Sequence, residues 1–308
     1  MSCVALWCDA TYTNASHKGQ ALMNSSASRA CKVVSLINMK GGVGKTTLAV
    51  GLAWELAQKH NVLLVDVDPQ FNATQWLVDD AQYLSWLNSS SKRTVFDVYA
   101  GEDLLGGIGG FGDKKKTKTS TTLKNAVMQV THKGVTLDIV PSSLELITLD
   151  AARRGTENRL NLFLQPARQK YEFVIIDCPP TASLFSLSAH IASDAYLVPI
   201  KPDPLSVLGL PLLERTIADY TNSYAHTVER LGLVPTMFRK TNAMRKALRH
   251  LRTQYAGEVY SSVIHQTTGV AEAVERGLPL QIYSKTRNNS NVPLGAIAAE
   301  FLKRQGGV

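Results

Sequence analysis

The chain has 308 residues, of which 44% are hydrophobic and 19% are charged, so it has enough apolar material for one large globular domain or two small ones. No apolar run approaches the roughly 18 residues that span a membrane, and the first ten residues lack the basic start and long apolar centre of a signal peptide. We therefore expect a cytoplasmic protein with no stable membrane insertion. The net charge of +8 suggests an anionic partner such as nucleic acid, although many basic proteins merely have solvated surfaces.

Short runs rich in Val, Ile and Leu alternate with amphipathic stretches along most of the chain. The start is rich in Ser, Ala and Asn without a sustained period, and we assign residues 1–31 to a flexible leader. The strand-like runs are residues 32–38, 61–66, 135–140, 173–177, 195–200 and 233–237. This order predicts an α/β fold over residues 32–308, with a mainly parallel twisted sheet and helices on both faces. Between residues 101 and 122 the composition shifts to Gly, Lys, Thr and Ser, which indicates a flexible insert.

A glycine-rich segment, residues 38–47 (NMKGGVGKTT), lies between the first strand and an apolar-periodic helix predicted for residues 48–58. Such an order is typical of a phosphate site, because glycines take positive φ and turn successive N–H groups toward phosphate oxygens. Lys45 is placed to reach the β and γ phosphates, and the Thr46 hydroxyl is placed to ligate Mg²⁺. The predicted ATP-binding residues are Lys40, Gly41, Gly42, Val43, Gly44, Lys45, Thr46 and Thr47.

The loop departs from the standard G-x-x-x-x-G-K-T spacing, because Met39 stands where a glycine is needed and an additional lysine, Lys40, precedes the glycines. Residues 40–47 resemble the deviant Walker A signature of the ParA/MinD superfamily of P-loop ATPases, and of ParA-type partition ATPases in particular. The resemblance implies an ATPase that binds ATP and Mg²⁺ and forms a nucleotide-dependent homodimer, with Lys40 crossing into the partner subunit's ATP site. A second cation there offsets the charge that develops during phosphoryl transfer.

Two acidic motifs follow at the ends of predicted strands, where open α/β sheets bind ligands. Residues 63–74 (LLVDVDPQFNAT) are similar to the second acidic motif of the family. The resemblance implies that Asp66 supports Mg²⁺ through water and that Asp68 orients the attacking water. Capping of the local backbone is the alternative role for either carboxylate. The family usually has glycine where this chain has Phe71, a difference that bears on the loop's conformation or on dimer contacts.

The other acidic motif is a buried-looking strand within residues 171–183 that ends in Asp177. It matches a Walker B motif, which implies that Asp177 holds a Mg²⁺-bound water. The three residues from 179 to 181 resemble the superfamily's switch region, and residues 198–206 and 269–274 also look ParA-like. The resemblance covers roughly residues 32 to 305, the insert excepted. The catalytic residues that it implies are Lys40, Lys45 and Asp68.

A basic segment from Arg239 to Arg252 carries six Arg or Lys residues, one His and no acid. Apolar residues at positions 244, 248, 251 and 255 form a helical stripe beside a basic one, so one face is free to pack and the other to meet phosphates. A solvated helix face is the ordinary interpretation, and a lysine cluster at residues 114–118 is a second candidate surface. The candidate DNA-binding residues are Arg239, Lys240, Arg245, Lys246, Arg249 and Arg252.

The resemblance implies non-specific DNA binding by a nucleoid-associated dimer, and a ParB-like adaptor that stimulates hydrolysis. We expect no operator-specific recognition, because the segment before Lys32 is too short for a helix-turn-helix domain. The cargo is left open between a plasmid, a chromosome and a protein assembly.

Other functions remain as alternatives. A MinD-like membrane-cycling ATPase would need a terminal amphipathic helix, and residues 294–308 are better interpreted as a final helix that packs on the core. An iron–sulfur ATPase would use cysteines from a dimer, but Cys178 is the only cysteine after Cys31. The four cysteines have neither zinc-site spacing nor the density of a disulfide scaffold. A nucleotide-binding scaffold without catalysis is disfavoured because every residue of the ATPase motifs is present.

Overall fold

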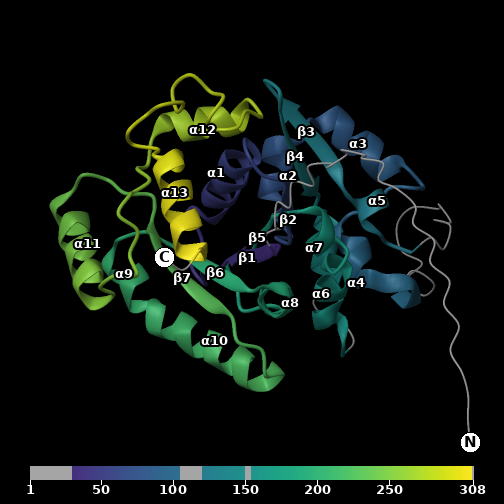
Figure 1. Cartoon of the computed structure of the whole chain (residues 1–308), viewed down its shortest axis with the longest axis horizontal. Helices are drawn as coiled ribbons and strands as arrows, with labels where there is room; N and C mark the ends of the chain where they lie inside the picture. The colour runs from purple at the N-terminus through teal and green to yellow at the C-terminus, as the bar shows by residue number, and fades with distance from the viewer. Residues whose placement is uncertain (1–29, 105–119, 150–153, 307–308) are drawn as a thin grey trace, which may run out of the picture.

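Seven strands form one sheet in the order β3-β4-β2-β5-β1-β6-β7 in a computed structural model that describes residues 30–104, 120–149 and 154–306 (Figure 1). Neighbouring strands run parallel except for β3, which pairs antiparallel with β4. The predicted mainly parallel sheet is therefore confirmed. The strands are β1 (Lys32–Leu36), β2 (Val62–Asp66), β3 (Met128–His132), β4 (Val135–Val140), β5 (Phe173–Asp177), β6 (Ala195–Ile200) and β7 (Glu229–Pro235).

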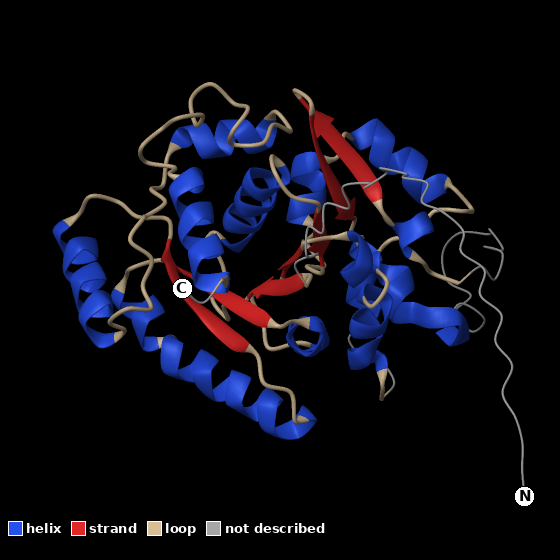
Figure 2. Ribbon diagram, viewed as in Figure 1, coloured by secondary structure: helices blue, strands red, loops and turns tan. Residues whose placement is uncertain are grey.

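Helices cover both faces of this sheet, as Figure 2 shows. The helix α1 packs with α13 on one face, whereas α6 packs with α4 and α8 on the other. No helix within the described ranges is long and apolar enough to cross a bilayer. The helices are α1 (Lys45–Ala57), α2 (Asn72–Leu77), α3 (Asp80–Asn88), α4 (Val95–Leu104), α5 (Leu123–Ala126), α6 (Arg159–Leu164), α7 (Ala167–Lys170), α8 (Leu184–Ala192), α9 (Pro204–Leu208), α10 (Leu210–Tyr224), α11 (Asn242–Gln254), α12 (Thr268–Glu275) and α13 (Leu294–Gln305).

The central strands are buried on both sides because alternate side chains enter two different cores. Val34 of β1 belongs to the core shared with α1 and α13, whereas Val33 belongs to the core shared with α6 and α8. Near-continuous apolar strands are the pattern that a parallel sheet with two covered faces requires. Ile297 and Phe301 of α13 are fully buried in the first core, which confirms that the last helix packs on the domain.

Several element boundaries differ from the prediction. The first helix begins at Lys45 rather than at residue 48, because its first turn is polar and carries no apolar period. The strand β7 begins at Glu229, four residues before the apolar run. The sequence interpretation missed β3, a strand that reaches β4 through a two-residue turn in which Lys133 and Gly134 both have positive φ.

The predicted leader and insert lie mostly outside the described residues. Of the leader, only residues 30 and 31 are described, and Cys31 is buried in the second core. Residues 101–104 of the predicted insert form the end of α4, and the lysine cluster at 114–118 is outside the described residues. The division into a leader, an ATPase domain and an insert therefore stays a prediction.

Candidate functional site

The three predicted motifs meet at the carboxyl edge of neighbouring strands. In the register of the sheet, Asp177 at the end of β5 stands opposite Asp66 at the end of β2 and opposite Leu36 at the end of β1. The glycine loop leaves β1 at this edge and leads directly into α1. Segments that are more than a hundred residues apart therefore form one site, as expected for an open α/β sheet.

The glycine loop has the backbone geometry that a phosphate site needs. Gly42 and Gly44 have φ values of 69° and 81°, the left-handed region that glycine adopts without strain. Gly44 immediately precedes α1, and the loop turns there into the helix N-terminus. The first N–H groups of a helix have no intrahelical partner and favour an anion. The loop and the start of α1 together therefore suit a phosphate group.

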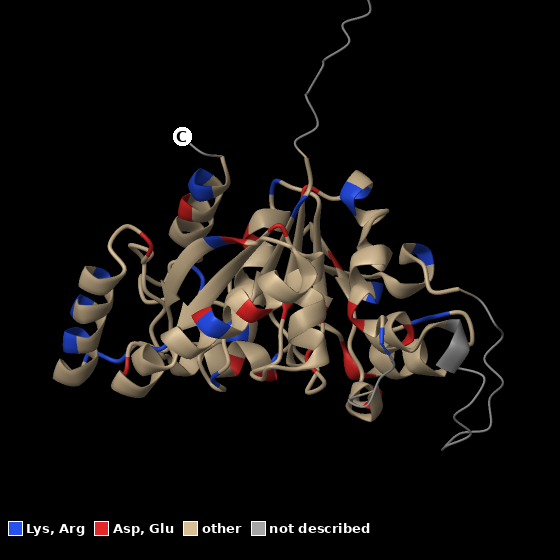
Figure 3. Ribbon diagram, turned by 90° about the horizontal axis from the view of Figure 1, so that it is seen from below, with Lys and Arg blue, Asp and Glu red and all other residues tan. Residues whose placement is uncertain are grey.

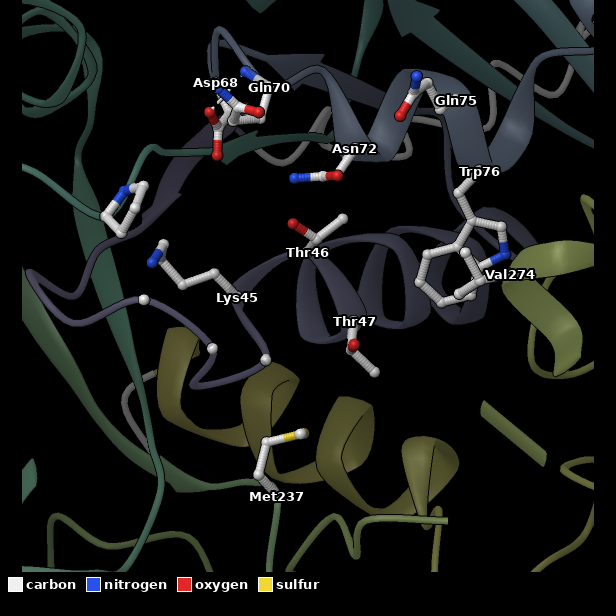
Figure 4. Close-up of a pocket in the computed structure, with 14 residues that line it drawn as sticks. Lys45, Thr46, Thr47, Asp68, Gln70, Asn72, Gln75, Trp76, Met237 and Val274 are labelled. Atoms are coloured by element: carbon white, nitrogen blue, oxygen red, sulfur yellow. Dashed lines mark hydrogen bonds between the residues drawn. The ribbon is translucent and has the colours of Figure 1, made fainter. Parts of the chain in front are cut away.

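A pocket of about 430 Å³ opens in front of this loop (Figure 4). Lys45 and Thr46 lie at the start of α1, and the segment with Asp68 and Asn72 lies across the pocket from them. The volume is in the range of small-molecule sites. The pocket is lined by Gly41, Gly42, Gly44, Lys45, Thr46, Thr47, Asp68, Gln70, Asn72, Gln75, Trp76, Pro180, Met237 and Val274.

Lys45 is a nearly buried cation, with 7% of the residue exposed. Its Nζ donates a hydrogen bond to the Lys40 carbonyl at 3.2 Å. Burial lowers the pKa of Lys45, while the charges of Asp177, Cys178 and Asp68 act in the opposite direction. An anionic phosphate in the pocket would further favour the charged lysine.

Asp177 is fully buried, and neither of its carboxylate oxygens has a hydrogen-bond partner among the described residues. Burial raises the pKa of Asp177 well above its usual range, and the charge of Asp66 adds to this, while nearby Thr46 and Lys45 favour the charged form. A buried carboxylate without a partner costs free energy that a cation or its water shell relieves. The donor chemistry at this position therefore fits Mg²⁺.

The described residues contain no group of three His, Cys, Asp or Glu side chains that could hold a metal ion by itself. Mg²⁺ prefers six oxygen ligands, keeps several waters and commonly takes the remainder from substrate phosphates. The Thr46 hydroxyl in the pocket and Asp177 behind it would supply the protein's share of such a shell. This division of ligands is typical of nucleotide sites.

The two acids of the second motif have different surroundings. Asp68 lines the pocket, and its Oδ1 accepts a hydrogen bond from the Gln70 N–H at 2.9 Å. Burial raises the pKa of Asp68, and the Gln70 N–H and the charge of Lys45 oppose that rise. Asp66 is absent from the lining and is completely buried, and burial raises its pKa to about 7 despite hydrogen bonds from Thr74. The role of Asp66 as a support for Mg²⁺ stays a prediction.

Lys40 is turned toward another part of its own chain. Its Nζ lies 3.1 Å and 3.4 Å from the two carboxylate oxygens of Asp203 and 2.9 Å from the Ser206 hydroxyl. Asp203 caps α9, and the Lys40 side chain is 39% exposed. Lys40 is not among the residues that line the pocket. Its predicted crossing into a partner subunit is not tested by a single chain.

The basic segment forms a helix with the expected two faces. Met244, Leu248 and Leu251 of α11 are buried, which confirms the predicted apolar stripe. Arg245, Lys246 and Arg249 are exposed, and none has an ion pair or a side-chain hydrogen bond in the described part of the chain. Figure 3 shows several basic positions, drawn in blue, along α11, the helix at the left edge.

The other three candidate DNA-binding residues lie at the ends of α11. Arg239 donates from its Nε to the Gln266 side chain at 2.7 Å, and Arg252 donates to the Ser261 carbonyl at 2.9 Å. Lys240 is exposed and precedes the helix. Its charge contributes to a lowered pKa at His265, although burial of that ring is the larger cause.

Sequence reasoning missed two apolar residues that line the pocket, Met237 and Trp76. Met237 follows β7 with a φ of 52°, and it lies within 3.5 Å of the position that a side chain at Gly44 would occupy. Trp76 of α2 is almost buried, and its Nε1 donates to the Leu278 carbonyl. Neither residue belongs to a charged or glycine-rich pattern, so no local signal marks it.

Known proteins resemble the chain along most of its length. The family described as AAA domain (AAA_31) matches residues 31–229. An uncharacterized protein of Pseudomonas putida is 30% identical over 279 residues, covering 89% of this chain and 95% of that protein. The chromosome partitioning protein ParA of Caulobacter vibrioides is 29% identical over 282 residues, with the same two coverages. A putative plasmid partition protein of Borrelia burgdorferi bound to AMPPNP has a TM-score of 0.70 at 19% identity, covering 89% of this chain and 99% of that one. We conclude that the chain belongs to the AAA_31 family, among the ParA-type partition ATPases.

Proposed function

We propose that the chain is a deviant Walker A ATPase that forms an ATP-sandwich homodimer, binds DNA non-specifically and hydrolyses ATP to segregate plasmid or chromosomal DNA. The observation that carries this proposal is the meeting of three features at one sheet edge: the glycine loop, Asp68, and Asp177, whose oxygens have no hydrogen-bond partner among the described residues. The similarity to a chromosome partitioning protein supports the cargo class. The protein would act in the cytoplasm on the nucleoid.

The cofactors are ATP and Mg²⁺. Mg²⁺ supplies neutralisation of the phosphate oxygens during phosphoryl transfer. In this proposal Lys45 and the N–H groups of the glycine loop bind the phosphates. Thr46 and Asp177 would supply the protein's share of the Mg²⁺ ligand shell. Asp68, at the edge of the pocket, orients the attacking water. Lys40 from the partner subunit completes the site, and a ParB-like adaptor stimulates an otherwise slow reaction.

The proposed DNA surface is the exposed face of α11. Arg245, Lys246 and Arg249 are exposed and have no ion-pair partner among the described residues, so no ion pair seen there needs to break when a phosphate binds. Contacts to phosphates alone are insensitive to sequence and release counterions, which makes affinity fall with salt. Three to six neutralised phosphates would give a slope of about −3 to −5 in a plot of log affinity against log salt.

The test measures binding to random-sequence duplex DNA with ATP, with ADP and without nucleotide, across a salt series. We expect binding that requires ATP, falls with salt and is lost in Arg245→Glu/Arg249→Glu. The control is Lys59→Glu/Lys303→Glu, which makes the same charge change. Lys59 lies just after α1 and Lys303 lies on α13, and both are exposed. Equal losses in both double variants would mean that only net charge matters, and no DNA binding in any nucleotide state would overturn this part of the proposal.

The membrane-cycling alternative is tested separately. The apolar side of α13 is packed against α1 in the core and leaves no free apolar face on that helix for a bilayer. Liposome flotation with ATP is therefore expected to leave the protein in the bottom fraction. Recovery of the protein with the liposomes would favour the MinD-like function.

A further inference from the structure

A closed ring of hydrogen bonds connects the two acids of the second motif with Thr74 and Ser142. The Thr74 N–H and hydroxyl donate to Oδ2 of Asp66 at 2.9 Å and 2.8 Å. The Ser142 N–H donates to the Thr74 hydroxyl at 2.9 Å, and the Ser142 hydroxyl donates to the Asp68 carbonyl at 2.9 Å. The Asp68 N–H donates to Oδ1 of Asp66 at 3.2 Å and closes the ring.

The ring is buried and joins three separate segments. Asp66, Thr74 and Ser142 are 0% exposed, and Asp68 is 5% exposed. They belong to the end of β2, to α2 and to the segment after β4. Each hydroxyl proton has one acceptor in the ring, so the direction of the bonds is set. Hydrogen bonds are stronger at low dielectric, and a fully satisfied buried network makes a structure rigid.

The ring holds the backbone of Asp68 and leaves its carboxylate to the pocket. Both backbone polar groups of Asp68 are ring members, whereas its side chain lines the pocket and accepts only from the Gln70 N–H among the described residues. A group that orients water must be held within a fraction of an ångström, because small misplacements of reacting groups reduce rates strongly. Neither Thr74 nor Ser142 lines the pocket, so neither contacts a nucleotide there.

We propose that Ser142 and Thr74 are positioning residues for hydrolysis, which act by holding the backbone of Asp68 through this ring. The inference rests on the proposed role of Asp68. It also gives Asp66 a defined task, since its two carboxylate oxygens accept three hydrogen bonds from the ring.

Ser142→Ala is a clean probe of the ring. The Asp68 carbonyl also accepts from the Phe71 N–H at 2.8 Å, so loss of the Ser142 hydroxyl leaves no buried acceptor without a partner. Ser143 is a matched control, because it is 3% exposed and its hydroxyl has no hydrogen-bond partner in the described ranges. For ATP turnover by the full chain with DNA, we expect kcat to fall about tenfold to a hundredfold in Ser142→Ala, with KM within about twofold. Ser143→Ala is expected to keep both parameters.

A double variant separates positioning from general stability. In an Asp68→Asn background, Ser142→Ala should cause no further loss, because its effect passes through Asp68. Thr74→Val should reproduce the loss of kcat and Thr74→Ser should restore it, since serine keeps the hydroxyl. Unchanged kcat in Ser142→Ala, or losses that multiply in the double variant, would overturn the inference. Normal turnover in Asp68→Asn alone would instead overturn the proposed role of Asp68.

Discussion

In the proposed dimer, Lys40 would exchange a contact within its own chain for one with the partner subunit. Its ammonium is held within the chain by Asp203 and Ser206. Burial alone would raise the pKa of Asp203, but hydrogen bonds from Ser206 and Lys40 and the lysine charge lower it overall. Because the Lys40–Asp203 ion pair is partly exposed, it contributes little free energy, and Lys40 can readily exchange it for another anionic partner. A partner's phosphates would offer Lys40 a more highly charged site.

We expect Lys40→Ala to bind ATP within about twofold of the wild type, because the lysine does not line its own pocket. We expect the same variant to lose ATP-dependent dimerisation, because it lacks the cation that the partner subunit's site is proposed to receive. Isothermal calorimetry measures the first quantity and sedimentation with ATP the second. Lys201→Ala is the matched control, since Lys201 also approaches Asp203, at 3.7 Å, and has no proposed role in the dimer. Normal DNA-stimulated turnover by Lys40→Ala would contradict the role across the dimer.

Phe71 stands where the resemblance implies glycine, and its backbone conformation is one that suits glycine. The residue has φ 43° and ψ 36°, a left-handed conformation that costs a bulky residue about 1–2 kcal/mol. Its ring stacks on Tyr83 with centroids 5.9 Å apart and 20° between the planes. Such a pair contributes about 0.5–1.5 kcal/mol beyond burial. The stacking therefore offsets most of the strain.

This balance predicts different results for two substitutions at the same position. Phe71→Gly loses the stacking but relieves the strain, so the free energy of unfolding should change by less than about 1 kcal/mol. Phe71→Ala loses the stacking while the strain is unchanged, and should destabilise the protein by about 0.5–1.5 kcal/mol. Urea denaturation of both variants checks the order. Equal destabilisation by both would mean that strain at residue 71 is negligible.

At the scale of the elements, the sequence predicts those helices and strands whose apolar residues recur at regular spacing. The apolar run of β5 and the apolar stripe of α11 are visible in the sequence because burial on one or both sides selects apolar residues at regular spacing. The strand β3 was missed although its alternate residues are buried, because it has only five residues and its turn uses a lysine at positive φ. A lysine with positive φ cannot be recognised from residue type, because lysine is not typical of that conformation.

Some residues of the candidate site could likewise be predicted from the sequence, and others could not. The glycine loop and the acids at the ends of β2 and β5 were predicted, because phosphate and metal chemistry restricts the residue types at fixed spacing. Ser142 was missed, since its bond to the Asp68 carbonyl joins residues 74 positions apart and serine is common in turns. Met237 was missed because a pocket wall requires only shape and apolar contact.

At the scale of the whole molecule, stability depends on buried groups that titrate, and His190 in α8 is one of them. The residue is fully buried, and neither ring nitrogen has a hydrogen-bond partner among the described residues. Its ring lies against Tyr220 and His226. Burial, assisted by the charge of His226, lowers the pKa of His190 from 6.5 to about 4. Between these two values the unfolded chain binds a proton that the folded chain excludes.

Stability from His190 is therefore complete above its unfolded pKa and is lost as the pH falls toward 4. From pH 7.5 to pH 5 the loss should be about 2 kcal/mol. Asp66 acts in the opposite direction: its pKa, raised by burial to about 7, favours the folded state at low pH. The pH profile of the wild type alone therefore mixes opposing contributions, and His190 must be isolated by comparison with a variant.

The comparison uses urea unfolding of wild type and His190→Leu at both pH values. Leucine fills the site with an apolar side chain, and the His190 ring nitrogens have no hydrogen-bond partner among the described residues that the variant would leave unpaired. The variant should therefore lose about 2 kcal/mol less than the wild type on acidification. His250→Leu, at an exposed position on α11, should retain the wild-type dependence. Parallel pH profiles for wild type and His190→Leu would mean that His190 gains a proton without unfolding, for example by local opening of α8. The acid sensitivity would then belong to that helix and not to the cooperative unfolding of the domain.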